Sequence, residues 1–233
     1  MIDLLVFPGD VVTTSKKNEK TRISSGLIQN GDNIQSSKVG FVRKDLRKKC
    51  LWIDNHQNRY IPSVEDTVIG VITERHSFQY KINIGAPRDA ILDALSFEGA
   101  TKRNKPNLQV GDLVYCRVVV ANKHMEPEVS CISLHFKKEW MTGEALFTRL
   151  EDGYVFECSL EFARKLLSDD CFILNCLGKY IPFEIAIGLN GRIWVKSSRI
   201  VLTIVITNCL LNSQHINNNK RMEQMVRILL DRV

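Results

Sequence analysis

The segment LSFEGATKRNKPNLQVGDLVYCRVVV, residues 95–120, decides the fold class of this chain. Both of its ends are strand-like, and the second end follows a Gly-Asp turn with a run of β-branched residues, which suit a pleated surface. Between the ends lies a basic loop with Lys102, Arg103, Asn104 and Lys105, and no acidic residue occurs among these four. A phosphate backbone is bound by flexible cations on a fixed scaffold. The segment therefore predicts a small β-barrel with a nucleic-acid-binding loop.

Short strand-like runs continue on both sides of this segment. The predicted strands are 68–72, 78–84, 95–97, 113–120 and 128–133. Residues 88–95 are long enough for one or two turns of helix, and no helix of normal length is required. Short strands separated by turns are typical of a small closed barrel, so the pattern predicts an OB-fold barrel for residues 63–138.

Three segments share one local sequence pattern, in which a turn ends in an aspartate and an apolar strand follows. The aspartates are Asp10, Asp66 and Asp112. The first of them opens a small N-terminal β domain, which we place at residues 1–62. The other two precede strands of the central barrel.

A different pattern begins near residue 143. A strand-like run at 154–158 leads to Ser159, a predicted N-cap, and to an amphipathic helix. A hairpin at 185–195 and a buried helix at 198–211 follow, and the last helix has an apolar stripe of Met222, Met225, Val226, Leu229 and Leu230. Residues 139–233 are therefore predicted as a mixed α/β module, and the chain as an α+β multidomain protein.

The composition is that of a soluble intracellular protein. The 32 lysines and arginines exceed the 26 acidic residues by 32 − 26 = 6, which is too small an excess to identify a partner. Seven cysteines without a CxxC pair argue against a disulfide scaffold or a zinc ribbon. The longest apolar run, 200–206, is too short to span a bilayer, and the N-terminus lacks the basic region of a signal peptide. We expect no membrane partner.

Single-stranded RNA is the partner that these features favour. The loop of Lys102, Arg103, Asn104 and Lys105 is the first candidate site, where the amide of Asn104 can contact RNA. A solvated turn between two strands is the alternative interpretation of that loop. Further candidates from neighbouring turns and strands are Arg75, His76, Phe78, Lys123 and His124.

Aromatic residues on the predicted strands provide surfaces for base stacking or for packing. Strict alternation along 78–84 places Tyr80 toward the core and leaves Phe78, at the start of the strand, undecided. On 113–120, Tyr115 and Arg117 alternate with apolar residues, which places them on the outer face. There they either contact RNA or pack against the next domain.

The sequence Gly188-Leu189-Asn190-Gly191 matches the G-x-x-G of KH domains, which clamps nucleotides. That clamp requires a turn between two helices, whereas strand-like runs flank this one. Asn-Gly between apolar runs is a strong hairpin signal because both residues tolerate a positive φ. We therefore favour a structural hairpin over an RNA clamp, with Trp194 as an interdomain packing residue.

The sequence offers no site for catalysis, for a metal ion or for a cofactor. Adjacent acids such as Glu65 and Asp66 do not converge on one point, as the carboxylates of a two-metal site must. The five histidines lack ligand spacing, and neither a Walker A loop nor a nucleophile elbow occurs. We expect a protein that is not an enzyme.

Several motifs together resemble one protein family. They are LSFEGATKRNKP at 95–106, QVGDL at 109–113, VANK at 120–123, MEPE at 125–128 and GLNGRIWV at 188–195. The chain is similar to the RNA-binding cap subunits of the eukaryotic RNA exosome, and among them to the smaller of the two that carry an S-one-type OB domain followed by a KH domain. The resemblance is weaker at 13–49 and in the linker 134–142.

The resemblance implies an S-one-type domain at 63–138 and a KH-type domain at 139–233. It also implies a non-catalytic subunit that sits with other cap subunits on a ring of RNase PH-like subunits and guides single-stranded RNA into it, for 3′-to-5′ RNA degradation and rRNA processing. The implied locations are the nucleus, the nucleolus and the cytoplasm. A purely structural scaffold and a free-standing ribosome- or translation-associated RNA-binding protein are the alternatives.

Overall fold

The structure is a computed structural model that describes residues 4–14, 22–45, 49–102, 104, 106–122, 124–133, 147–168, 171–216 and 218–230. The chain divides into two compact units between Gln57 and Asn58. Each unit has a hydrophobic core of its own. The finer domain limits at residues 62 and 138 stay a prediction.

The first unit consists of two small β-sheets. One has the order β1-β6-β7-β3 and the other the order β2-β5-β4. The strands are β1 (Leu5–Val6), β2 (Val11–Thr14), β3 (Arg22–Ile23), β4 (Leu27–Asn30), β5 (Asn33–Ser36), β6 (Gly40–Asp45) and β7 (Cys50–Asp54). Their core consists of Val6, Leu27, Ile34, Leu51 and Ile53. The predicted N-terminal β architecture is confirmed.

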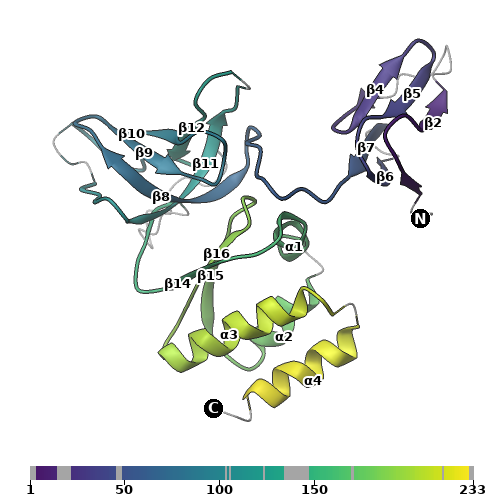
Figure 1. Ribbon diagram of the computed structural model, residues 1–233. Helices are drawn as coiled ribbons and strands as arrows, with labels where there is room; N and C mark the ends of the chain where they lie inside the picture. The colour runs from purple at the N-terminus through teal and green to yellow at the C-terminus, as the bar shows by residue number, and fades with distance from the viewer. Residues whose placement is uncertain are drawn as a thin grey trace. The chain divides into compact units, whose positions relative to one another are not determined.

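The second unit begins with a five-stranded barrel (Figure 1). Its strands are β8 (Thr67–Arg75), β9 (Gln79–Asn83), β10 (Ala90–Phe97), β11 (Leu113–Val120) and β12 (Glu128–Cys131). Neighbours pair in the order β12-β10-β9-β8-β11, and the additional pairing of β12 with β11 closes the barrel. A two-residue strand, β13 (Arg149–Leu150), pairs with the start of β11 on the edge opposite β8. The OB-type prediction is confirmed.

The short helix considered for residues 88–95 does not form. Strand β10 occupies this stretch, and Ala90, Leu92 and Ala94 on its inner face are buried in the barrel core. Three inward residues at a period of two are the signature of a half-buried strand. The alternation of buried and exposed residues therefore identifies residues 90–97 as a strand.

The three aspartate turns have the same pattern of hydrogen bonds. In each turn the carboxylate accepts the N–H of the residue three positions earlier, and the aspartate N–H donates to the carbonyl of that same residue. The pairs are Phe7–Asp10 (2.8 and 3.0 Å), Ser63–Asp66 (3.2 and 3.2 Å) and Gln109–Asp112 (2.7 and 3.1 Å). The residue before each aspartate has a positive φ, at Gly9, Glu65 and Gly111. Strands β2, β8 and β11 begin directly after these turns.

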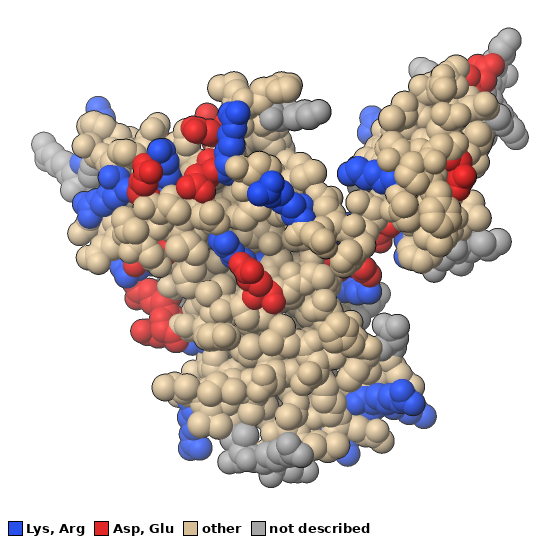
Figure 2. Space-filling view, viewed as in Figure 1, with Lys and Arg blue, Asp and Glu red and all other residues tan. Residues whose placement is uncertain are grey.

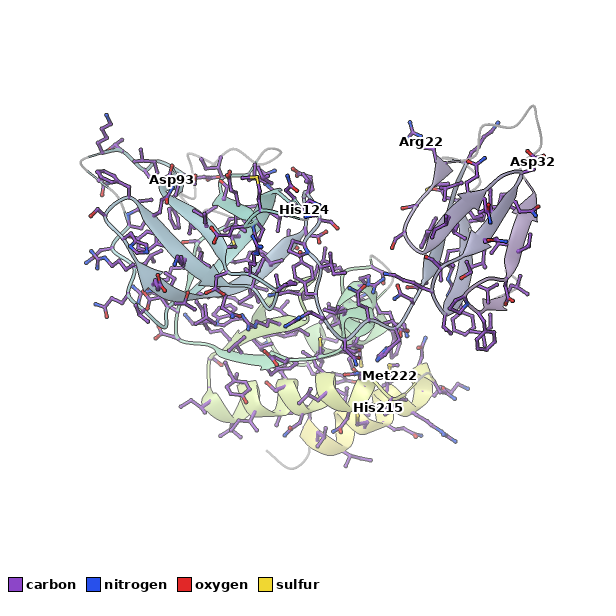
Figure 3. The ribbon with its side chains drawn as sticks, turned by 45° about the horizontal axis from the view of Figure 1, so that its top comes forward. Arg22, Asp32, Asp93, His124, His215 and Met222 are labelled. Atoms are coloured by element: carbon purple, nitrogen blue, oxygen red, sulfur yellow. The ribbon has the colours of Figure 1, made fainter. Side chains whose placement is uncertain are left out.

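The remainder of the second unit is a KH-type module. Its antiparallel sheet has the order β14-β16-β15 (Tyr154–Glu157, Arg192–Ser197 and Phe183–Ile187), and its helices are α1 (Leu160–Leu166), α2 (Phe172–Gly178), α3 (Ile200–Ser213) and α4 (Asn219–Leu230). Helix α3 packs on β16, and α4 packs on α2 and α3 (Figure 1). Met222 of α4 faces this core, and His215 lies in the turn before α4 (Figure 3).

The helices differ from expectation in two respects. Ser159 caps α1 as predicted, because its Oγ accepts the Phe162 N–H at 3.3 Å. Helix α2 was not predicted, since seven residues are too few for a clear periodic pattern. Helix α3 is not buried all round, because Ile200 is 81% exposed and Ile204 is also exposed. No helix in the described part of the chain is long and apolar enough to cross a bilayer.

Candidate nucleic-acid interface

The basic loop, residues 99–111, lies between β10 and β11. Arg103 and Lys105 lie outside the described residues, so the structure places Lys102 and Asn104, which are both exposed. The N–H groups of Thr101 and Asn104 each donate to the carbonyl of the other at 2.9 and 3.1 Å, and Thr101 Oγ1 also accepts the Asn104 N–H at 3.1 Å. These bonds close a tight turn that keeps Lys102 at the surface.

The basic loop is anchored in the barrel at its ends and in its middle. Phe97, just before the loop, and Leu108, within it, are both buried in the barrel core. Between them, Tyr80 Oη donates a 2.9 Å hydrogen bond to the carbonyl of Pro106. Tyr80 is only 3% exposed, as alternation along β9 predicted. The loop therefore carries its cations on a scaffold with fixed attachment points.

A cleft of about 580 Å³ lies beside the basic loop. It is lined by Arg75, His76, Ser77, Tyr80, Pro106 and Asn107. Phe78 belongs to the same β8–β9 turn and is 73% exposed. The cleft thus brings the candidates of that turn next to the basic loop. Ser77 and Asn107 were not among the candidates, because turn residues of these types are common and carry no specific signal.

Part of the charge at the β8–β9 turn is neutralised locally. Glu74 Oε2 lies 2.8 Å from Lys81 Nζ and 3.3 Å from His76 Nε2. The Lys81 ammonium holds the pKa of the Glu74 carboxyl below its usual value, so a carboxylate stands beside His76 at neutral pH. No acidic residue occurs from 99 to 111, by contrast. The basic loop is therefore a stronger phosphate candidate than His76.

The visible face of the barrel mixes charges of both signs (Figure 2). Lysine and arginine side chains lie among aspartate and glutamate side chains, and they form no continuous basic surface in this view. On this face a polyanion would meet local clusters of cations and no extended basic surface.

Tyr115 packs against the KH-type module. Its hydroxyl donates to the carbonyl of Ile187 at 3.3 Å, and its ring centroid lies 5.2 Å from that of Phe147. Burial raises the pKa of Tyr115 above its usual value, so the hydroxyl stays a hydrogen-bond donor at neutral pH. Of the two alternatives for this residue, the structure supports interdomain packing.

Arg117 lies on the outer face of β11, as predicted, because Cys116 and Val118 beside it are buried in the barrel core, but its side chain is covered. Arg117 is only 8% exposed, and it forms an ion pair with Glu65 and donates to the carbonyl of Ile132 at 3.3 Å. Glu65 has φ +72 and stands where the other two aspartate turns have glycine. Its N–H donates to Val118 O at 2.9 Å, so the ion pair helps to hold this turn on β11. Alternation could not reveal a partner 52 positions away.

A second group of polar residues lies in the turn before β12. Lys123 lies outside the described residues, and His124 is exposed (Figure 3). The His124 N–H donates to Asn122 Oδ1 at 3.1 Å, and its carbonyl accepts from Arg88 Nη1 at 3.0 Å. Sequence reasoning missed Arg88, because the bond spans 36 positions and no motif marks it.

The G-x-x-G sequence forms the turn of a hairpin, as predicted. Strands β15 and β16 pair on both sides of it, and Gly191 has φ +79. A Cβ on Gly191 would lie 2.6 Å from the carbonyl oxygen of Cys158, and one on Gly188 would lie 2.9 Å from the backbone nitrogen of Ile69. The glycines thus allow close packing within the protein and do not present backbone to a nucleotide.

Asn190 fastens this turn to the barrel. Its Oδ1 accepts the Ile69 N–H at 3.3 Å, and its Nδ2 donates to the carbonyls of Ile69 and Ile84 at 2.8 and 2.9 Å. The neighbouring Leu189 N–H donates to Thr67 O at 2.8 Å. A buried amide whose polar atoms all have partners is a structural element. Asn190 is therefore not free to read a base.

Two further side chains strengthen the contact between the barrel and the KH-type module, which we call the joint. Arg192 donates to the carbonyl and to the side-chain oxygen of Asn83 at 2.6 and 2.9 Å. Trp194 is buried in one cluster with Ile69 of the barrel and Ala186 of β15. The predicted interdomain packing of Trp194 is confirmed.

The described side chains form no candidate metal centre, and the buried thiols have raised pKa values. No group of three or more His, Cys, Asp or Glu residues that could hold a metal ion occurs among them. Burial raises the pKa of Cys116 to about 12 and those of Cys158 and Cys209 to about 11. Such thiols are protonated at neutral pH and react slowly as nucleophiles.

Two protein-family models match the chain. The model described as exosome complex component RRP40, S1 domain, matches residues 60–143, and a KH domain model matches residues 153–200. Similar curated proteins include the exosome complex component rrp40 of Dictyostelium discoideum, which is 48% identical over 219 residues (94% of this chain and 89% of that protein). RRP40 of Homo sapiens is 40% identical over 208 residues (87% and 74%), and rrp40 of Schizosaccharomyces pombe is 36% identical over 225 residues (93% and 91%).

A solved structure is also similar. It is a crystal structure of an exosome complex RNA-binding protein, with a TM-score of 0.61 and 20% identity over 75% of this chain and 98% of that chain. At this level of identity the likeness concerns the fold alone.

Proposed function

This chain belongs to the RRP40 family of exosome complex components, and from that premise we propose that it is a non-catalytic RNA-binding cap subunit. It guides single-stranded RNA into a ring of RNase PH-like subunits for 3′-to-5′ processing and degradation, rRNA included. The observation that carries the RNA contact is the basic loop. Lys102 and Asn104 are exposed there, on an anchored turn beside the cleft that Arg75 and His76 line.

The cations of the basic loop bind the RNA backbone. Lys102, Arg103 and Lys105 neutralise phosphates and release counterions, which favours binding at low salt. The exposed ring of Phe78 stacks on a base. Charge and stacking discriminate little among bases, so the sequence preference is slight. Lys123, His124 and Arg88 form a second, weaker phosphate contact.

The subunit positions RNA and leaves the chemistry to other proteins. Support comes from the two domains that match, an S1 domain and a KH domain, which are nucleic-acid-binding modules. A purified sample of the chain should therefore leave a labelled oligo(U) at full length. Shortening of the RNA by the chain alone would refute this part of the proposal.

The test of the RNA contact is the Lys102/Arg103/Lys105→Glu triple variant, measured by fluorescence anisotropy with oligo(U). Loss of three phosphate contacts should make the slope of log K against log salt shallower by about 2, since each contact contributes about 0.7 on a single strand. Stability should change by less than about 0.5 kcal/mol. Unchanged binding, together with unchanged threading of RNA in the assembled complex, would refute the contact and leave the scaffold role.

Partners and location can be tested in cells. The RNase PH-like subunits and other cap subunits should co-purify with the tagged chain. Co-purification with ribosomes alone would favour the free-standing alternative. Fluorescence microscopy should find the tagged chain in the nucleus and nucleolus, and also in the cytoplasm.

A further inference from the structure

Three tyrosines of the barrel, the buried Tyr60 and Tyr80 and the partly buried Tyr115, each donate a hydroxyl hydrogen bond to a different part of the second unit. Tyr60 donates to Asp66 Oδ2 at 2.7 Å, in the turn that precedes β8. Tyr115 donates to the carbonyl of Ile187, in the KH-type module. Tyr80 donates to the carbonyl of Pro106, in the basic loop. The bonds of Tyr80 and Tyr115 have the same chemistry, since each ends on a backbone carbonyl, but only that of Tyr80 reaches the candidate RNA surface.

Tyr80 is placed to control the basic loop without touching RNA. Its ring belongs to the barrel core, and β9 pairs with β8 and β10 on its two sides. Its hydroxyl is therefore held by a rigid scaffold. Proline has no N–H, so the carbonyl is the backbone group through which Pro106 can be fixed by a hydrogen bond.

We propose that Tyr80 is a positioning residue for RNA binding, which pre-orders the basic loop through its bond to Pro106. This rests on the proposed contact of the loop with RNA. Lys102 and Asn104 lie in the sequence between the buried Phe97 and Pro106. The hydrogen bond from Tyr80 fixes Pro106 and so shortens the unanchored stretch of chain that carries them. RNA binding costs the conformational entropy that the loop still has in the free protein. A loop that is already ordered before binding loses less of it, so RNA binds more tightly.

The test compares Tyr80→Phe with Tyr115→Phe in the full chain. Each variant removes one hydroxyl that donates to a backbone carbonyl, so both should lower the melting temperature by similar, small amounts. Only Tyr80→Phe should weaken binding to oligo(U), by about fivefold, the factor that one lost hydrogen bond corresponds to. Amide hydrogen exchange over residues 99–107 should become faster in Tyr80→Phe alone. This second measurement does not depend on RNA.

The outcomes separate the positioning role from the proposed function. The positioning role would be overturned if both variants changed oligo(U) affinity equally. It would also be overturned if the amide hydrogens of the loop exchanged at the native rate in Tyr80→Phe. Neither result would affect the RNA contact itself. Lys102→Glu serves as the reference for that contact. If Lys102→Glu binds oligo(U) as tightly as the native chain, the RNA contact fails, and the positioning role fails with it.

Discussion

Two loops of this chain have sequences typical of nucleic-acid binding, and the structure gives them opposite environments. Asn104 of the basic loop is exposed, and hydrogen bonds within the loop use its backbone. Asn190 of the G-x-x-G turn is buried, and its amide makes three hydrogen bonds to the barrel. A motif supplies residue types, but a ligand can use only polar atoms that the fold leaves free. The comparison supports our proposal that RNA binds the basic loop, whereas the G-x-x-G turn stabilises the fold.

The largest expected effect is that of Gly191→Asp on stability. The substitution places a side chain at φ +79, against the Cys158 carbonyl, and introduces a charge at a buried position. We expect a loss on the order of 4 kcal/mol in the free energy of unfolding. Oligo(U) affinity of the fraction that remains folded should change much less, as measured by anisotropy below the melting temperature.

Gly99→Asp is the matched control in the basic loop. Gly99 has φ +75, and a Cβ there meets no atom within 4 Å, so the cost should be about 1 kcal/mol from backbone strain. The new carboxylate should instead weaken oligo(U) binding, because it stands near Lys102. If Gly191→Asp strongly weakens RNA binding but leaves the melting temperature close to that of the native chain, the hairpin interpretation is wrong.

The next effect in size compares one residue type in both loops. Asn190→Ala leaves buried backbone groups of Ile69 and Ile84 without these partners, which should cost about 3 kcal/mol in chemical denaturation. Asn104→Ala should change stability by less than about 0.5 kcal/mol and weaken oligo(U) binding a few fold. An Asn190→Ala protein of native stability would contradict the account of the joint.

Arg117 and Lys102 extend the comparison to cations. Arg117→Met removes the ion pair with Glu65 and the bond to Ile132 but keeps most of the apolar stem, so we expect a loss of about 1–2 kcal/mol. Its effect on the salt dependence of RNA binding should be small. Lys102→Met should do the reverse, making the salt slope shallower at constant melting temperature. A shallower salt slope in Arg117→Met would show that this arginine does contact phosphate.

The smallest effect is a change in thiol reactivity at the joint. The Cys158 N–H donates to Gly191 O at 2.7 Å, and burial raises the pKa of Cys158 to about 11. At pH 8 only about one such thiol in a thousand is ionised, so alkylation by iodoacetamide should be slow. It should become faster in Gly191→Asp, whereas Cys50 of the first unit should react alike in both proteins. Equal labelling of Cys158 in both would mean that the turn does not cover it.

Local patterns in the sequence predicted much of the fold. The aspartate turns at Asp10, Asp66 and Asp112 each form the expected start of a strand, because their hydrogen bonds lie within four residues. Period-two alternation placed Tyr80 in the core, and the hairpin signal of Asn190-Gly191 outweighed the G-x-x-G motif. These features are local in the chain, so one sequence is enough to predict them.

The rest depended on contacts between distant segments. Asn190 bonds to Ile69, 121 positions away, and Arg192 bonds to Asn83, 109 positions away. No local pattern indicates that a polar residue has such a partner, so alternation predicted the outer face for Arg117 but not its ion pair with Glu65. The basic loop could be predicted as a candidate because its signal is local. Its anchor through Tyr80 could not, because it needed the barrel to be closed.

The central claim is that RNA lies on the basic loop and not on the G-x-x-G turn. Photocrosslinking of the full chain to a photoreactive oligo(U), followed by mass spectrometry of the linked peptides, tests it most directly. The account predicts crosslinks within residues 98–107 and 75–78, which the Lys102/Arg103/Lys105→Glu variant loses. Crosslinks concentrated at 188–195 in the native chain, with the basic loop unlabelled, would contradict it.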